Sequence, residues 1–222
     1  MFSQGKSIVI VGAGPNLGVA VARRFGREGL AVGLVSRTQS KLDDLAAQLE
    51  SDGIRAAGAA ADIRDADALT EAITTLAGQL GPVEVLEYSP LPAREFMTPI
   101  LETPVDDVRG PLEFSILGAV AATRAVIEPM REAGRGTILF TTGGAAINPY
   151  PLRAGVGISF AGEVAYARML HDELVGEGVH VAHTAIGGSI APGGDHEPDE
   201  VAEVLWRHHT ERDGFQMRLG ID

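Results

Sequence analysis

Three glycines near the start of the chain could form a turn that binds phosphate. Gly12, Gly14 and Gly18 lie in IVIVGAGPNLGVAVARRF, directly after a buried-strand pattern and at the start of a helical one. Glycine permits a tight turn and close backbone approach, and the following helix N-terminus offers unpaired N–H groups to a pyrophosphate. This context favours dinucleotide binding over a purely structural turn. The predicted site also includes the residues between these glycines, Pro15, Asn16 and Leu17.

The end of the second predicted strand indicates which dinucleotide is bound. A site for NAD usually has an acid there that accepts hydrogen bonds from the ribose 2′-hydroxyl. This chain has Ser36 and Arg37 instead. A guanidinium pairs well with a 2′-phosphate, so these residues favour NADP over NAD, although a solvated arginine at a helix N-terminus is the alternative. Asp62 and Ile63 follow the third strand and could line an adenine slot, or equally be a helix cap and a core residue.

Strand and helix patterns alternate along the whole chain. The strand patterns are SIVIVG, AVGLVS, RAAGAAADI, VEVLEYS, GTILFTT and VHVAHTAIG, and helical patterns lie near 16–28, 41–51, 66–80, 105–133, 160–175 and 198–210. Such alternation indicates parallel strands joined by right-handed crossovers. We therefore predict an α/β fold over residues 1–222, a single doubly wound Rossmann-type domain whose parallel sheet has helices on both faces.

The composition of the chain limits which partners the protein is expected to bind. The 222 residues include 18 basic and 30 acidic side chains, for a net charge of −12. Repulsion opposes nucleic acid and anionic membranes, so neither is expected as a partner. The chain has no cysteine, and His180 and His183 would lie on opposite faces of a strand, so we expect no metal site. The N-terminal apolar run is too short for a signal peptide, and we expect a soluble, cytoplasmic protein.

These pieces, in this order, resemble the short-chain dehydrogenase/reductase family over essentially the whole chain. The similar features are the glycine turn, the Asp62–Ile63 pair, the strands VEVLEYS and GTILFTT, and the helix ending LHDEL. The resemblance implies an oxidoreductase, a nicotinamide cofactor, and homodimers or homotetramers built on two long helices, at 105–133 and 160–175.

The resemblance also assigns further cofactor contacts. Asn16 replaces the middle glycine of the family's turn, and asparagine tolerates left-handed backbone conformations, so the turn can survive. Ser89 lies in YSPL, which replaces the family's Asn-Asn-Ala-Gly motif. Ile186 ends the strand VHVAHTAIG and, with the following segment 187–190, can cover the nicotinamide.

The family's catalytic positions carry different residues in this chain. Aligned on TILFTTGGAA, the family serine falls at Gly143, the tyrosine at Val156 and the lysine at Phe160; the asparagine falls at Ser115. Alignment from the helix end HDEL gives the same register. The resemblance therefore implies an atypical member without the usual proton-handling groups.

Three hydroxyl side chains could substitute. Thr142 adjoins Gly143, Tyr150 lies in the following loop, and Tyr88 ends the fourth strand; each could instead be a satisfied structural hydroxyl. Two functions follow. One is an oxidoreductase that transfers hydride to or from a carbonyl or alcohol substrate with non-standard residues. The other is a catalytically inactive dinucleotide-binding sensor or subunit.

Overall fold

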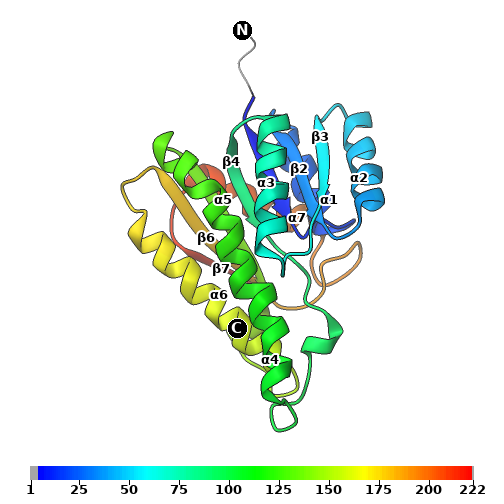
Figure 1. Ribbon diagram of the computed structural model, residues 1–222, viewed down its shortest axis with the longest axis vertical. Coiled ribbons are helices and arrows are strands. Elements are labelled where there is room, and N and C mark those ends of the chain that lie inside the picture. Colours follow the sequence, from blue (N-terminus) through cyan, green and yellow to red (C-terminus); the bar gives the residue numbers. More distant parts are fainter. Residues whose placement is uncertain (1–4, 222) are drawn as a thin grey trace.

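The computed structural model describes residues 5–221, which form a seven-stranded sheet in the order β3-β2-β1-β4-β5-β6-β7 (Figure 1). The strands are β1 Ser7–Val11, β2 Ala31–Ser36, β3 Ala56–Ala60, β4 Val83–Tyr88, β5 Gly136–Gly143, β6 Val179–Ile186 and β7 Gln216–Leu219. Every pairing is parallel. The strand order reverses between β1 and β4, and ligands of such sheets bind at the carboxyl ends beside this reversal.

Helices cover both faces of the sheet, which confirms the predicted fold class. They are α1 Leu17–Gly26, α2 Gln39–Ser51, α3 Ala66–Leu80, α4 Val105–Leu112, α5 Gly118–Glu132, α6 Ala154–Glu173 and α7 Pro198–Glu211. One core cluster joins the sheet to α3, α5 and α6, and a second joins its other face to α1, α2 and α7 (Figure 1). The central strands form because most of their residues are apolar on both faces; all of β1 is buried.

The long helical run contains an irregular turn. Between α4 and α5 the chain forms a π-helical segment, Glu113–Leu117, without leaving the helical path. By length and composition the run Val105–Glu132 could cross a membrane, but over half of its most apolar part is buried inside the protein. It packs on α3 and α6 as a core helix.

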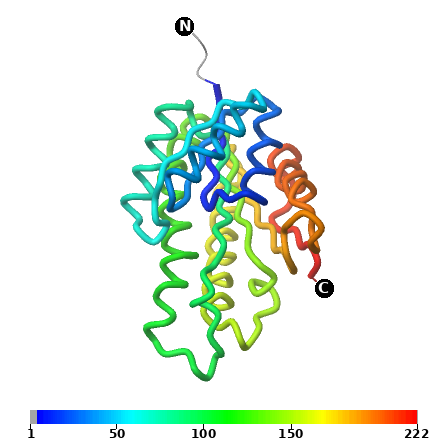
Figure 2. Tube along the Cα trace, turned by 90° about the vertical axis from the view of Figure 1, so that its right-hand side faces the viewer, coloured from blue at the N-terminus to red at the C-terminus, as the bar shows by residue number. Residues whose placement is uncertain are grey.

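Two elements differ from the sequence prediction. The α6 helix begins at Ala154, six residues before the predicted start, so that Val156 and Phe160 lie in its first two turns. Strand β7 was not predicted; it is a short edge strand paired with β6. Beyond the sheet, the segments 97–104 and 147–154 run side by side (Figure 2), joined by backbone bonds from Ile100 to Pro151 and from Ala154 to Thr98.

Candidate active site

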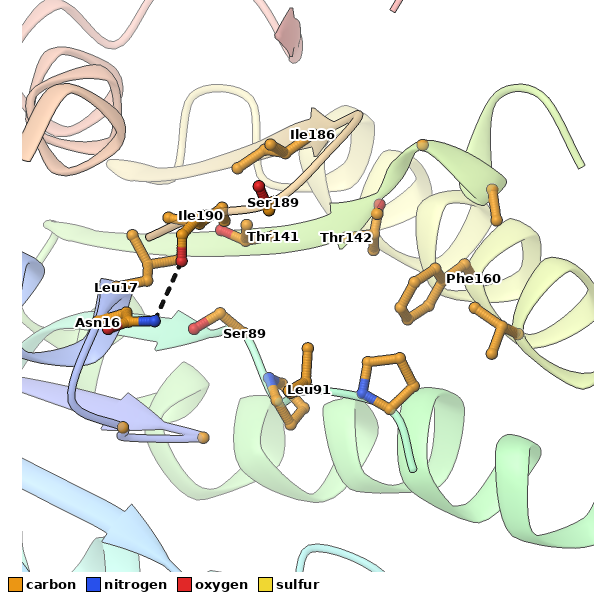
Figure 3. Close-up of a pocket in the computed structure, with 18 of the residues that line it drawn as sticks. Asn16, Leu17, Ser89, Leu91, Thr141, Thr142, Phe160, Ile186, Ser189 and Ile190 are labelled. Carbon is orange, nitrogen blue, oxygen red and sulfur yellow. Dashed lines mark hydrogen bonds between the residues drawn. The ribbon is translucent and has the colours of Figure 1, made fainter. Parts of the chain in front are cut away.

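A cleft of about 500 Å³ opens at the carboxyl ends of β1, β4, β5 and β6. Its walls come from the glycine turn, the turn after β4, the end of β5, the start of α6 and the loop after β6 (Figure 3). The cleft is lined by the predicted cofactor residues Gly12, Gly14, Pro15, Asn16, Leu17, Gly18, Ser89 and Ile186. Eight of the residues predicted from the sequence to bind the cofactor therefore line one cavity in the fold.

Packing requires glycine at two positions of the turn, Gly12 and Gly18, and leaves the third, Gly14, open. Gly12 has φ 96°, and an added Cβ would lie 2.5 Å from the Cα of Pro90, so only glycine fits. Gly18 lets α1 approach the preceding turn, since its Cβ would be 3.0 Å from Ala13 Cα. At Gly14 the nearest atom would be 3.9 Å away, so its backbone is open to the cleft. An open glycine backbone beside a helix N-terminus fits a pyrophosphate.

Asn16 closes the turn in a different way from the one expected. Its φ is −96°, so it does not use a left-handed conformation. Its side-chain Nδ2 instead donates a hydrogen bond of 3.2 Å to the carbonyl oxygen of Ile190 (Figure 3). The side chain therefore ties the glycine turn to the loop after β6, across the mouth of the cleft.

The opposite end of the cleft is hydrocarbon. Val156 and Phe160 both line it and are almost fully buried. An added Cβ on Gly143 would lie 3.4 Å from Phe160 Cε2, so the phenyl ring packs against the end of β5. Ser115 does not line the cleft; it lies in the π-helical segment, buried, and donates a hydrogen bond to Glu163 of α6.

Of the three substitute hydroxyls, one lines the cleft. Thr142 is among the lining residues, whereas Tyr150 is half exposed and outside them. Tyr88 is fully buried, and its hydroxyl donates a 2.5 Å hydrogen bond to the carbonyl oxygen of Phe114. The idea that Tyr88 reaches the cleft is wrong, because its alternating position on β4 turns the ring into the core.

Thr142 ends a chain of hydrogen bonds with a fixed direction. Arg218 Nε donates to Gln216 Oε1 at 3.3 Å, which leaves the amide nitrogen facing His183 Nδ1 at 3.0 Å. Burial lowers the pKa of His183 to about 4, so the ring is neutral and accepts at Nδ1. Its proton is then on Nε2, which donates to Thr142 Oγ1 at 2.8 Å. The hydroxyl proton of Thr142 is left for another acceptor.

Four residues predicted to bind the cofactor lie outside the cleft lining. Ser36 is the last residue of β2 and Arg37 follows it, and Arg37 is exposed. Asp62 forms a 3.0 Å ion pair with Arg64, and Ile63 belongs to the core cluster. Their proposed contacts with the adenosine end of a dinucleotide stay predictions.

Sequence reasoning missed an acid behind the cleft. Glu87 of β4 is fully buried, and its carboxyl group accepts hydrogen bonds from Ser89 and Thr141, both of which line the cleft. Burial raises its pKa to about 8. The signal was present in VEVLEYS, where an acidic residue interrupts a strand that must be buried on both faces.

Comparison with known proteins decides the family. The family model for short chain dehydrogenases matches residues 6–194. The chain belongs to the short chain dehydrogenase family. It is 28% identical over 222 residues to 1-deoxy-11-beta-hydroxypentalenate dehydrogenase of Streptomyces exfoliatus, covering 93% of this chain and 80% of that protein. A short chain dehydrogenase of Pseudocercospora fijiensis is 28% identical over 178 residues, 79% of this chain and 57% of that protein's length.

Solved structures of the family have the same fold. The short-chain dehydrogenase of Rhodopseudomonas palustris superposes with a TM-score of 0.85 at 27% identity, covering 96% of this chain and 97% of that one. A metagenomic short-chain oxidoreductase in complex with NADP superposes with a TM-score of 0.83 at 25% identity, covering 99% of this chain and 96% of that one. The L-sorbose reductase of Gluconobacter frateurii, complexed with NADPH and L-sorbose, superposes with a TM-score of 0.88 at 20% identity, covering 98% of this chain and 95% of that one. At this identity the likeness is one of fold.

Proposed function

We propose that this short chain dehydrogenase is an oxidoreductase that binds a nicotinamide dinucleotide, NADP in preference to NAD, and acts on a carbonyl or alcohol substrate without the family's usual catalytic residues. The observation that carries the proposal is a continuous cleft that runs from the open backbone of Gly14 to the apolar wall formed by Phe160. When bound, the cofactor would supply the hydride. The chain has to orient it and polarise the substrate oxygen.

Thr142 is the residue we assign to the substrate oxygen. The chain from Arg218 through Gln216 and His183 leaves its hydroxyl as a donor. A fixed donor of this kind stabilises the negative charge that develops on a carbonyl oxygen during reduction. Tyr150, the other candidate, is less well placed because its ring is outside the cleft lining.

The hydrocarbon side chains of Val156 and Phe160 favour the second candidate function, a sensor or subunit that binds the dinucleotide without turnover. Neither side chain can hold or move a proton, and both line the cleft. General acid catalysis contributes about 10²- to 10⁴-fold to a rate, so we expect slow reduction of ordinary ketones.

The two functions are separated by a panel of aldehydes and ketones at saturating NADPH. We expect measurable reduction that falls by about 10²-fold in Thr142→Val, because a fixed donor to the oxyanion is lost. Gln216→Leu should lower kcat and leave KM and NADPH affinity unchanged, since it removes the hydrogen bond that orients the ring of His183. Tyr150→Phe is the matched control and should retain wild-type turnover. Tight NADPH binding with no turnover of any carbonyl would instead assign the sensor function.

The preference for NADP is tested at Arg37. We expect Arg37→Ala to weaken NADPH binding by about tenfold, the loss of one charge-assisted pair with the 2′-phosphate, and to leave NADH binding nearly unchanged. Fluorescence titration of both nucleotides measures this. Arg27→Ala is a suitable control, since Arg27 lies at the far end of α1. Equal losses for NADPH and NADH would remove the phosphate role from Arg37.

A further inference from the structure

Two hydroxyl groups in the cleft share one buried carboxyl group. Ser89 Oγ donates to Glu87 Oε2 at 2.8 Å, and Thr141 Oγ1 donates to Glu87 Oε1 at 3.3 Å. Both hydroxyl side chains line the cleft, on the side of Asn16 and away from Phe160 (Figure 3). The carboxyl group lies behind them, fully buried in the sheet.

The surroundings of Glu87 hold its proton on. Its neighbours at the same level of the sheet, Ile10 of β1 and Leu139 of β5, are uncharged. Within residues 5–221 it forms no ion pair, and the ionisable group coupled to it from another element is the buried acid Glu163 of α6. Burial raises the pKa of Glu87 to about 8 although the two hydroxyl bonds oppose the shift. At neutral pH the carboxyl group is therefore mostly protonated.

The protonation state of Glu87 sets what the two hydroxyls can offer a ligand. An ionised carboxylate only accepts hydrogen bonds, so the protons of Ser89 and Thr141 both point at Glu87. A neutral carboxyl group donates its own proton to one of the two hydroxyls. That hydroxyl can then donate its proton into the cleft. The pair is thus a donor to a ligand in the neutral state and an acceptor in the ionised state.

We propose that Glu87, Ser89 and Thr141 form a proton-linked binding site for a negatively charged pyrophosphate oxygen of the dinucleotide, which is bound when Glu87 is neutral. The inference rests on the proposed function, since the ligand is the dinucleotide. An anionic oxygen requires donors, and an ionised carboxylate behind the hydroxyls would both remove them and repel the anion. The pyrophosphate is the part concerned because the two hydroxyls lie on the same side of the cleft as the glycine turn.

Linkage gives the direction of the pH dependence. Binding favours the protonated form, so affinity is full below the pKa of free Glu87 and is lost as pH rises through it. With that pKa near 8, the Kd for NADPH should increase about tenfold between about pH 7 and pH 9. Binding in the upper part of this range should take up a proton.

The test is calorimetric titration of the full chain with NADPH at about pH 7 and pH 9, in two buffers that differ in ionisation enthalpy, so that proton uptake is measured directly. Glu87→Gln carries an amide that donates to Ser89 at every pH, and it should bind equally well at both values. Glu163→Gln is the matched control: Glu163 is equally buried, its pKa is also raised to about 8, and its partner Ser115 lies outside the cleft lining. It should keep the tenfold loss.

Each outcome decides the question. NADPH binding by the wild type with equal affinity at both pH values overturns the inference and leaves the proposed function standing. Failure to bind NADPH or NADH at either pH overturns both. Loss of the pH dependence in Glu163→Gln would show that the linked proton is on Glu163, and the assignment to Glu87 would be wrong. Should Glu87→Gln fail to fold, infrared spectroscopy of the wild type replaces it: the carboxylic acid band should persist to higher pH with NADPH than without, and an unchanged midpoint contradicts the proposal.

Discussion

The triple variant Gly143→Ser/Val156→Tyr/Phe160→Lys is expected to reduce carbonyl substrates about 10²- to 10⁴-fold faster than the wild type, the usual contribution of general acid catalysis. The structure has room for it. Val156 and Phe160 both face the cleft, and the atom nearest to a new side chain on Gly143 belongs to the ring of Phe160, which the variant removes. A phenol would then stand beside the bound substrate, with an ammonium nearby to lower its pKa.

A matched variant isolates the phenolic proton. Gly143→Ser/Val156→Phe/Phe160→Lys differs from the triple variant by one hydroxyl group and should lose the gain in kcat while retaining NADPH affinity. Steady-state kinetics with NADPH and a panel of ketones measures the difference, and thermal unfolding checks that both variants fold. If both fold, bind NADPH and turn over equally slowly, the assignment of Val156 to the acid position is wrong.

The second large effect is at the glycine turn, where two glycines should fail in different ways. Gly12→Ala places a methyl group 2.5 Å from Pro90 Cα at a φ of 96°, and we expect the free energy of unfolding to fall by about 3 kcal/mol from strain and overlap. Gly14→Ala meets nothing closer than 3.9 Å, so its stability should change by less than about 0.5 kcal/mol. Its methyl group fills the cradle, and NADPH binding should weaken by about tenfold or more.

Gly29→Ala separates strain from overlap at Gly12. Gly29 also has a positive φ, 91°, but an added Cβ there meets no atom within 4 Å. We expect it to cost about 1 kcal/mol and to leave NADPH affinity unchanged. Urea denaturation and calorimetric titration of the three variants give both quantities. Weakened stability with normal NADPH affinity in Gly14→Ala would remove Gly14 from the binding site.

The fold could be predicted because its signals are local. Each central strand is a short buried apolar run, and each helix carries an amphipathic pattern, so their alternation indicates a parallel sheet. The start of α6 could not be predicted from local signals, since Gly155 and Gly157 have low helix propensity. Tertiary packing decides there: a side chain on Gly155 would meet Pro111 and the carbonyl oxygen of Phe96 at under 3 Å. Strand β7 is short and half exposed, and it carries no clear alternation.

Some parts of the candidate site could likewise be predicted from the sequence, and others could not. The glycine turn is contiguous in sequence, and its residues were predicted and line one cleft. The hydrogen-bond chain of Thr142 joins side chains from three strands, His183 on β6 and Gln216 on β7 included. No spacing along the chain reveals such a contact, and β7 itself was unpredicted. Glu87 was visible as an acid in a buried strand, but its bond to Thr141 depends on the pairing of β4 with β5.

The most direct test of the account is calorimetric titration of the purified wild-type chain with NADPH and with NADH at about pH 7, where Glu87 is still mostly protonated. We expect one site per chain, with NADPH bound about tenfold more tightly than NADH if Arg37 pairs with the 2′-phosphate as proposed. A folded protein that binds neither nucleotide would contradict it.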